Sequence, residues 1–297
     1  MSLNKEMSAA EVVAQLRDGM TIGIGGWGPR RKPMAIVREL LRSSLKDLTV
    51  VGYGGPDMGM LCAAGKVKKL IYGFVSLDFI PLEPFFRKAR EAGSIEAMEL
   101  DEGMLHWGLR AAAMRLPFLP TRVGLATDFM KNNPGVRVVR SPYDDGEVLM
   151  AMPALKLDVA LVHVHTADRR GNTRLYSPDP FFDELFARAA ERCYVSCEAL
   201  VDQIASDEVD ARCNPFERSL VNGVVTARGG AHPTSHVATQ GPGYGWDAAH
   251  IKRYCAAAEE EGGWAKYAAE FLGASEADYQ KSVGGLDAIL ALPRQVM

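Results

Sequence analysis

Short apolar segments rich in β-branched residues recur along the chain, and longer helical stretches lie between many of them. Several of the short segments are apolar without alternation, which is typical of strands covered on both faces. The predicted strands are residues 21–24, 48–52, 69–77, 94–100, 123–127, 136–141, 159–166 and 192–201, and the helical stretches include 33–43, 81–92, 105–116 and 180–191. This alternation predicts an α/β fold with a mostly parallel sheet flanked by helices.

The chain after Gly241 has a different pattern. Residues 246–272, WDAAHIKRYCAAAEEEGGWAKYAAEFL, have helical periodicity and no strand pattern. We therefore expect residues 1–297 to form a single domain with a helical C-terminal extension at 241–297, packed on the outside of the domain or on a partner.

Composition and charge narrow the function classes. The 297 residues are 47% hydrophobic, and 34 Lys and Arg against 37 Asp and Glu give a net charge of −3. Because the sequence has no long run of like-charged residues, we do not expect nucleic acid or an anionic membrane to be the main partner. Five scattered cysteines favour a reducing compartment, and neither a secretory signal nor an apolar run near 20 residues appears, so we expect a cytoplasmic protein.

The segment 21–33, TIGIGGWGPRRKP, has the G-x-G-x-x-G spacing of a dinucleotide-binding loop at Gly23, Gly25 and Gly28. A strand precedes it, but two prolines delay the next helix to about Pro33. The second strand ends in glycines, and its first acidic residue is Asp57. The NAD interpretation therefore lacks two of its three supports.

A second interpretation is a loop facing an oxyanion or a thioester carbonyl. The loop residues are Gly25, Gly26, Trp27 and Gly28, with positive charge from Arg30, Arg31 and Lys32. A plain strand-to-helix turn remains the alternative. A second glycine turn, with Tyr53, Gly54 and Gly55, follows the next strand, and two such loops at one sheet edge favour a cleft.

An acidic cluster formed by Glu99, Asp101 and Glu102 ends a predicted strand, just before Gly103 and a helix. One of these carboxylates in a cleft could act as a general base. The alternative for any one of them is a solvated acidic turn that favours the helix N-terminus. Glu102 is the best candidate for the base because it lies closest to the helix start.

Two histidines, His163 and His165, share one face of a predicted strand. No H-E-x-x-H or C-x-x-C accompanies them, so we interpret them as structural or cleft-lining and expect no metal. Cys193 and Cys197 are expected to be buried thiols. The loop 229–236, GGAHPTSH, is expected near the cleft or a partner.

Four segments taken together indicate a protein family more specifically than any one of them does alone. They are GGWGPRRKPMAIVREL, LTVVGYGGPDMGMLCAAGKVKKLI, LRAAAMRLPFLPTRVGLATD and DVALVHVHTADRRGN. In order and spacing they resemble the α subunits of family I CoA-transferases of the glutaconate CoA-transferase type, over about residues 16–201. The resemblance implies a NagB/RpiA/CoA-transferase-like fold, a homologous β subunit in an α2β2 heterotetramer, and a glycine loop in the active-site cleft. It implies no cofactor beyond coenzyme A as part of the substrate.

The sequence departs from the transferase pattern at the acidic cluster. The serine-glutamate-asparagine-glycine type motif around the nucleophilic glutamate of the β half is not found here, and Glu102 stands where transferase α subunits usually have an uncharged residue before the glycine. The stretch ELDEGMLHWGLRAAAMRLPFLPTR, with GGAHPTSH, resembles the α subunits of bacterial steroid ring-cleaving CoA hydrolases, a branch acting in cholesterol degradation.

That second resemblance implies hydrolytic opening of a cyclic β-keto acyl-CoA, with Glu102 activating water or abstracting a proton. Arg30, Arg31, Lys32 and Arg122 are candidates for binding CoA phosphates or a substrate carboxylate. A true CoA-transferase α subunit is the alternative, and a ligand-binding regulatory protein on the same fold is a third, non-enzymatic class.

Overall fold

The computed structural model describes residues 4–204, 213–239, 241 and 243–294. Its main sheet has the strand order β11-β10-β8-β1-β2-β3-β4, with all neighbours parallel, and the short β9 pairs antiparallel with β8. The strands are β1 (Thr21–Trp27), β2 (Leu48–Tyr53), β3 (Val67–Tyr72), β4 (Glu96–Glu99), β8 (Leu157–Asp168), β9 (Thr173–Arg174), β10 (Ala190–Val201) and β11 (Val221–Thr226). The predicted mostly parallel sheet is confirmed.

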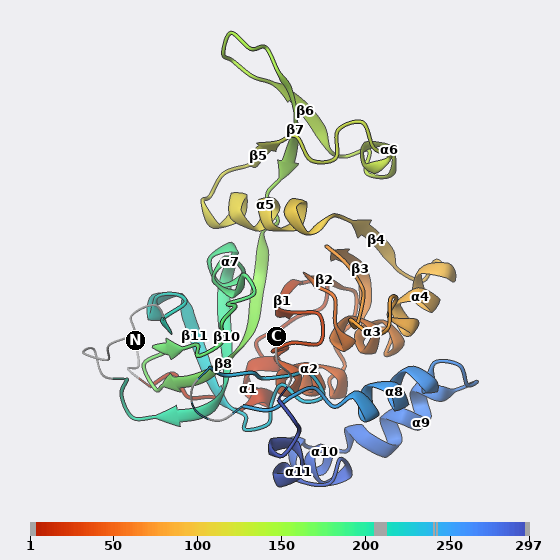
Figure 1. Ribbon diagram of the computed structural model, residues 1–297, viewed down its shortest axis with the longest axis vertical. Helices are drawn as coiled ribbons and strands as arrows, with labels where there is room; N and C mark the ends of the chain where they lie inside the picture. Colours follow the sequence, from red (N-terminus) through yellow and green to blue (C-terminus); the bar gives the residue numbers. More distant parts are fainter. Residues whose placement is uncertain (1–3, 205–212, 240, 242, 295–297) are drawn as a thin grey trace.

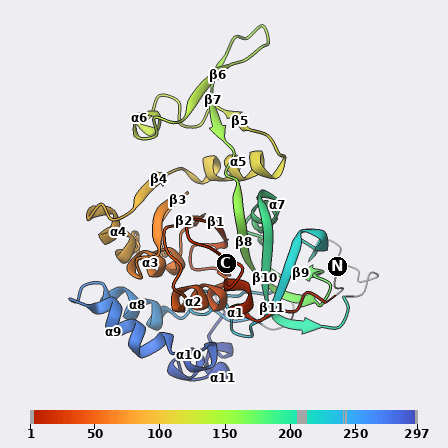
Figure 2. The same ribbon diagram turned by 180° about the vertical axis from the view of Figure 1, so that it is seen from behind.

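Helices cover both faces of this sheet, as Figure 1 and the reverse view in Figure 2 show. One face carries α1 (Ala9–Val13), α2 (Met34–Arg42), α3 (Pro56–Ala63) and α4 (Pro84–Glu91), and the other carries α5 (Glu102–Ala113) and α7 (Asp183–Ala189). Strand β8 shows why its sequence lacks alternation. Val159 and Leu161 enter one core while Ala160 and Val162 enter the other, so these four successive positions are all apolar.

A small antiparallel sheet projects beyond α5 at the top of Figure 1. Its order is β5-β7-β6, with β5 (Phe118–Thr121), β6 (Arg137–Arg140), β7 (Val148–Pro153) and the short helix α6 (Phe129–Asn132). The prediction of a strand at 123–127 is wrong. Gly124 and Ala126 have φ of 86° and 59°, so this segment turns instead of extending. The strand predicted at 136–141 exists, but it belongs to this antiparallel sheet.

The C-terminal part is helical where the structure describes it. It contains α8 (Ala248–Ala257), α9 (Gly263–Tyr267), the π-helical turn η3 (Ala268–Leu272), α10 (Glu276–Ser282) and α11 (Leu286–Leu290), and the 3-10 turn η2 (Arg218–Leu220) precedes β11. The buried Arg38 of α2 joins this part to the domain, because its Nε donates to Glu276 Oε2 at 2.8 Å. None of the described helices is long and apolar enough to cross a membrane.

The strand order places a ligand site. Sequence order runs outward from β1 through β2, β3 and β4, while β8, β10 and β11 extend from the opposite side of β1. In open α/β sheets, ligands bind outside the carboxyl ends of the strands where the order reverses. The loops after β1 to β4 are therefore the place to look for a site.

Candidate functional site

The carboxyl ends of four neighbouring strands bring aromatic side chains and one carboxylate together. Trp27 and Tyr53 are the last residues of β1 and β2, Phe74 follows β3, and Glu102 follows β4. Gly73 allows the close approach of the last two loops, since a Cβ added there would lie 3.2 Å from the Glu102 Cα. The cleft expected at this sheet edge is therefore built from the segments that the sequence indicated.

The three carboxylates of the acidic cluster have different surroundings. Glu99 pairs with Arg90 at 2.9 Å, and Asp101 is the N-cap of α5, accepting a 2.7 Å hydrogen bond from the Met104 N–H. Glu102, at the first position of α5, is exposed and accepts a 3.1 Å hydrogen bond from Trp27 Nε1. Two of the acids have structural roles, and Glu102 is the one whose carboxylate is presented to solvent without an ion pair among the described residues.

Aromatic rings surround the indole that contacts Glu102. The Trp27 ring centroid lies 4.7 Å from Phe74 and 6.5 Å from Phe181, and the Arg30 guanidinium lies 5.0 Å above the indole. These contacts fix the orientation of the Trp27 N–H donor. Glu102 therefore sits beside an apolar, rigid wall, which suits the binding of an apolar acyl group.

Tyr53 contributes a buried hydroxyl that has no hydrogen-bond partner within the described part of the chain. Burial raises the pKa of Tyr53 well above its ordinary value, and the nearby Glu102 and Glu184 carboxylates raise it further. The hydroxyl therefore stays protonated at neutral pH and can donate. An unsatisfied buried donor of this kind costs about 1–3 kcal/mol, so a ligand that accepts its hydrogen bond is favoured.

Backbone strain marks the α7 side of the cleft. Phe181 and Phe182 have consecutive positive φ values of 52° and 62°, a conformation that bulky residues adopt rarely and at a cost of about 1–3 kcal/mol each. Phe182 packs 5.3 Å from Tyr53 and 4.6 Å from His106. Strained residues of this type cluster at functional sites, and here they bring Phe181 near Trp27 and Phe182 near Tyr53.

The β1 loop does not present its amides as predicted. The Gly26 N–H donates to Asp183 Oδ1 at 2.9 Å, the Trp27 N–H to the Arg30 carbonyl at 3.0 Å, and the Gly28 N–H to the Tyr53 carbonyl at 3.0 Å. Gly26 is needed because its φ is 76° and an added Cβ would lie 2.5 Å from the Arg30 oxygen. The oxyanion interpretation needs correction for these three amides, since their donors are already used inside the protein.

Gly25 and the second glycine turn have structural roles in the fold. A Cβ on Gly25 would lie 2.5 Å from Asp183 Oδ1, so this glycine admits the α7 carboxylate. Gly54 donates its N–H to the Phe74 carbonyl at 3.0 Å. Gly55, with φ of 112°, is the N-cap residue of α3. The turn thus joins the ends of β2 and β3, which brings Tyr53 and Phe74 to the same cleft.

Two of the three basic residues at 30–32 are buried, contrary to the expectation that they bind a ligand. Arg31 is 1% exposed and pairs with the buried Asp183 at 2.6 Å, while the buried Lys32 donates to the Tyr53 carbonyl at 2.9 Å. Neither cation is presented to a phosphate or a substrate carboxylate, because each is enclosed with a partner of its own. Arg30 is partly exposed and pairs with Asp78 at 2.6 Å beside Trp27, so Arg30 alone of the three borders the cleft.

Arg122 lies in the small sheet region, away from the β1 loop. Its side chain is 77% exposed, and its Nη2 donates to Glu147 Oε2 at 2.7 Å. The chain therefore presents this guanidinium to solvent, where a ligand or a partner can reach it. The structure does not bring Arg122 into contact with Glu102.

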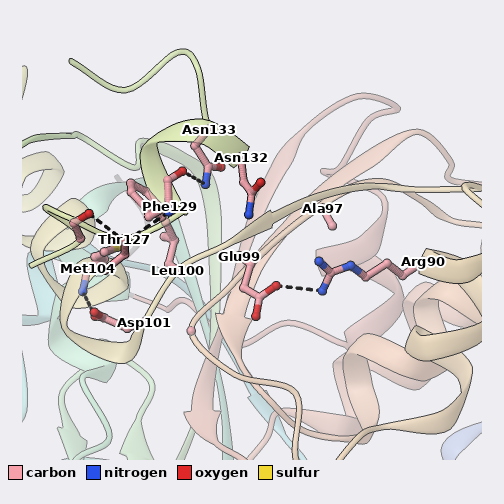
Figure 3. Close-up of a pocket in the computed structure, with 12 residues that line it drawn as sticks. Arg90, Ala97, Glu99, Leu100, Asp101, Met104, Thr127, Phe129, Asn132 and Asn133 are labelled. Carbon is pink, nitrogen blue, oxygen red and sulfur yellow. Dashed lines mark hydrogen bonds and ion pairs between the residues drawn. The ribbon is translucent and has the colours of Figure 1, made fainter.

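A large open pocket adjoins the acidic cluster (Figure 3). Its volume is about 610 Å³, and polar groups from β4, the start of α5 and α6 line it, including the Arg90–Glu99 ion pair, Asp101 and the amides Asn132 and Asn133. Glu102 itself is not among its lining residues, although Gly73 and Asp101 border both. The pocket thus provides open space beside the exposed Glu102 carboxylate and the aromatic side chains next to it.

Sequence reasoning missed three features of the site. Phe181 and Phe182 were placed in a helical stretch, and Asp183, which anchors both Gly26 and Arg31, was not singled out. The run Pro-Phe-Phe-Asp-Glu at 180–184 carries the only available signal, a proline and acidic residues at a helix start. The predicted shared face of His163 and His165 is confirmed, since both rings lie within 5 Å of His236.

Comparisons with known proteins agree with this architecture. Residues 6–226 match the family described as coenzyme A transferase. The chain is 49% identical over 287 residues to the cholesterol ring-cleaving hydrolase IpdA subunit of Rhodococcus jostii, covering 94% of this chain and 96% of the relative. It is 49% identical over 290 residues to the subunit of the same name from Mycobacterium tuberculosis, covering 94% and 97%. The crystal structure of glutaconate coenzyme A-transferase from Acidaminococcus fermentans matches with a TM-score of 0.87 at 26% identity, covering 98% of this chain and 96% of that chain.

Proposed function

Because this chain belongs to the coenzyme A transferase family, we propose that it is the α subunit of a heteromeric hydrolase that opens the ring of a cyclic β-keto acyl-CoA in cholesterol catabolism. The observation that carries the proposal is the exposed carboxylate of Glu102 beside the aromatic wall of Trp27 and Phe74. The 49% identity to ring-cleaving hydrolase subunits over nearly the whole chain supports the substrate class.

In the proposed reaction, Glu102 accepts a proton from water while the water oxygen attacks the ring carbonyl carbon. The tetrahedral intermediate collapses, and the bond between that carbon and the α-carbon of the thioester breaks. Its electron pair passes to the α-carbon as a thioester enolate, which takes back the proton from Glu102. One water is consumed, and a single product carries a new carboxyl group and an intact CoA thioester.

Trp27 and Tyr53 have supporting roles in this proposal. The indole N–H holds one oxygen of Glu102 at 3.1 Å, which leaves the other oxygen for the water. The Tyr53 hydroxyl, buried without a partner, is the candidate donor to the developing oxyanion in place of the occupied amides of the β1 loop. Removing one such donor typically costs about 100-fold to 1000-fold in rate.

The assembly is part of the proposal. We place the chain with a homologous β subunit in a cytoplasmic α2β2 heterotetramer, with no cofactor beyond the CoA carried by the substrate. The relatives are themselves described as subunits, and this supports a partner for the present chain. Arg122, exposed on the small sheet, and Arg30, at the edge of the cleft, are the candidates for binding CoA phosphates or a substrate carboxylate.

A CoA-transferase is the second candidate function. The similarity to glutaconate CoA-transferase over 98% of the chain favours it. In that reaction CoA passes through a carboxylate to an acceptor acid, and Glu102 has no necessary part. The acidic cluster would then be a capped helix start only.

The test is to co-express the chain with the product of its neighbouring reading frame and to mix the complex with a cyclic β-keto acyl-CoA. The assay is run with and without an acceptor acid such as acetate or succinate. We expect ring opening without acceptor, with incorporation of one oxygen from ¹⁸O-labelled water into the new carboxyl group. Turnover that requires the acceptor, with a glutamyl-CoA adduct trapped by borohydride on the partner, would establish the transferase instead.

A further inference from the structure

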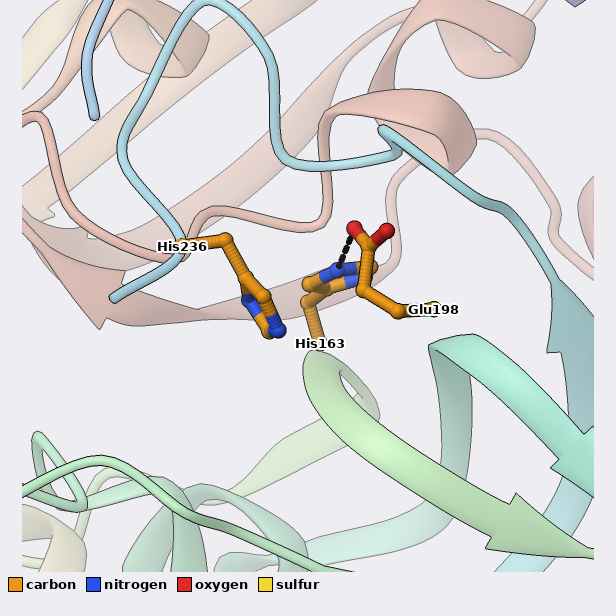
Figure 4. Close-up of side chains that lie close together, drawn as sticks. All are labelled: His163, Glu198 and His236. Carbon is orange, nitrogen blue, oxygen red and sulfur yellow. Dashed lines mark hydrogen bonds and ion pairs between the residues drawn. The ribbon is translucent and has the colours of Figure 1, made fainter. Parts of the chain in front are cut away.

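A second cluster of reactive side chains lies on the other side of the β1 loop, between strands β8 and β10 and the loop that follows β11. It consists of His163 from β8, Glu198 from β10 and His236 from the loop (Figure 4). One ligand atom from each lies within 4.8 Å of the other two. His163 and His236 are 0% exposed, so the cluster is inside the protein.

The state of His236 is the key observation. Both of its ring nitrogens are buried, and neither has a hydrogen-bond partner in the described part of the chain. Its neighbours are rings, with centroids of His165 at 3.9 Å and His163 at 4.8 Å. A buried imidazole without partners costs about 1–3 kcal/mol for each unsatisfied group, so something polar is needed at this position.

The remaining groups supply a ligand set of the right chemistry. Both ring nitrogens of His236 lack a hydrogen-bond partner in the described part of the chain, so either can serve as a ligand atom. The Glu198 carboxylate is held in place by the Gly229 N–H and the Tyr244 hydroxyl, each donating to it at 2.7 Å. Two neutral imidazoles and one carboxylate are a common donor set for divalent first-row transition metals.

Neighbouring residues fix the orientation of these donors. The Ser196 hydroxyl lies 2.8 Å from His163 Nδ1, and His163 Nε2 lies 3.0 Å from Glu198 Oε1. The Ser196 contact on Nδ1 orients the ring so that Nε2 faces Glu198, and a metal ion would replace the proton now shared between Nε2 and Oε1. His165 is excluded from the set, because its Nε2 contacts the Val237 carbonyl at 3.1 Å and its Nδ1 accepts the Tyr176 N–H at 3.1 Å.

We propose that His163, Glu198 and His236 bind a divalent first-row transition metal ion, such as Zn²⁺, in addition to the function proposed for the Glu102 cleft. In a tetrahedral site with bonds of about 2.0–2.1 Å, the ligand atoms lie about 3.3 Å apart. The His163 Nε2 and Glu198 Oε1 atoms, now hydrogen-bonded at 3.0 Å, need to separate by about 0.3 Å to admit the ion, and His236 needs to approach by at most about 1.5 Å. The expectation of no metal, made from motif spacing, is thus replaced by a proposal from geometry.

An entry path is present. A cavity of about 260 Å³ adjoins the cluster and is lined by His236, Glu198, His165, Tyr244 and Arg228. It has room for a water molecule as a fourth ligand. The loop that carries His236 also supports the β1 loop, since the Arg31 N–H donates to the Ser235 carbonyl at 2.7 Å. A bound ion would therefore stiffen the support of the β1 loop.

The test uses the tag-free complex with its partner subunit, stripped with a chelator and dialysed against Zn²⁺. We expect about one zinc per chain by elemental mass spectrometry and a rise in Tm on zinc addition. Co²⁺ substitution should give the visible absorption bands of a four-coordinate site. Glu198→Gln and His236→Asn should each weaken metal binding at least tenfold, whereas His106→Gln, a histidine outside the cluster, should not.

Several results would contradict the proposed metal site. Less than 0.1 zinc per chain, no Tm shift with either ion, or binding that survives both ligand variants would overturn the proposal. Glu198→Gln has the same shape and keeps one acceptor oxygen for the Tyr244 hydroxyl or the Gly229 N–H, so it remains informative should His236→Asn fold poorly. These readouts do not depend on turnover, so failure of the hydrolase proposal would leave them unchanged.

Discussion

The indole N–H of Trp27 donates a 3.1 Å hydrogen bond to the Glu102 carboxylate across 75 positions of sequence. Trp27 ends β1 and Glu102 begins α5, so this contact spans the carboxyl ends of the sheet from the strand beside the reversal of order to its edge. It joins an aromatic group fixed by packing to a carboxylate that is exposed. The pair therefore defines where a reacting water would be held.

Replacing Glu102 by Gln should lower turnover by about 100-fold to 10,000-fold, because that is the usual contribution of a general base. Assembly and Tm should stay unchanged, since the side chain is exposed and contributes little to the core. Ring opening is measured by loss of substrate in the liquid chromatogram. Glu96→Gln, an exposed acid of β4, the strand that precedes α5, is the matched control, and a fully active Glu102→Gln complex would exclude the mechanism.

Tyr53→Phe should have opposite effects on stability and activity. Deleting a buried hydroxyl that has no partner should leave the free energy of unfolding unchanged or raise it by about 1 kcal/mol. The same change should lower kcat by about 100-fold, with a smaller effect on KM, because the donor is needed mainly by the oxyanion. Chemical denaturation and steady-state kinetics on one preparation test both parts. Equal kcat in variant and parent would leave the hydroxyl without a catalytic role.

The buried pair Arg31–Asp183 should behave as part of the framework. Arg31→Met should cost about 3–5 kcal/mol, because it leaves the Asp183 carboxylate buried without its cation. The double variant Arg31→Met/Asp183→Asn should recover much of this, since Asn still accepts the Gly26 N–H. Urea unfolding of the two variants gives the comparison. A stable Arg31→Met protein with weakened acyl-CoA binding would instead return Arg31 to the ligand site.

Arg122→Ala should leave the free energy of unfolding close to that of the parent, because its pair with Glu147 is exposed and solvent screens it. If the guanidinium binds the CoA part of the substrate, KM for acyl-CoA should rise about tenfold while kcat stays near the parent value. Glu147→Gln breaks the same ion pair without removing the cation and serves as the control. Identical KM values in parent and Arg122→Ala would remove Arg122 from the site.

Glu83 should make stability depend on pH. Burial raises its pKa from an ordinary 4.5 to about 7, although the Tyr254 hydroxyl and the Phe86 N–H donate to it. Between these values the folded protein keeps a proton that the unfolded chain has released, so this group lowers the free energy of unfolding as pH rises from about 4.5 to about 7.

Glu83→Gln removes this titration. The free energy of unfolding of Glu83→Gln relative to the parent should therefore increase over that pH interval, by about 3 kcal/mol at most. Urea unfolding at several pH values measures the difference, which also cancels the titrations shared by both proteins. A difference that stays constant with pH would mean that Glu83 is ionised in the folded state throughout.

The mostly parallel sheet was predictable from local pattern. The run 159–162 is apolar at every position, and this indicates cover on both faces, which is typical of a parallel sheet. Parallel strands bring their carboxyl ends to one edge, and this places Trp27, Tyr53 and Glu102 at one cleft. No contact information was needed for that step.

Other features could not be predicted because they depend on pairings between distant segments. The basic triplet at 30–32 has the pattern of an anion site, but Asp183, over 150 positions away, enters the fold beside it and buries Arg31. The run 123–127 has strand composition, yet positive φ at Gly124 and Ala126 turns it within the small sheet. In both cases tertiary contacts decide what local composition leaves open.

The helix α5 has a mechanical consequence. It carries Glu102 at its first turn, and its other end leads into β5 of the projecting sheet. Its 12 residues form a rod about 18 Å long, so a rotation of about 5° about the far end would carry Glu102 through about 1.5 Å. That displacement would break the 3.1 Å contact with Trp27. A tilt of this rod caused by binding at the small sheet would therefore carry the Glu102 carboxylate away from Trp27.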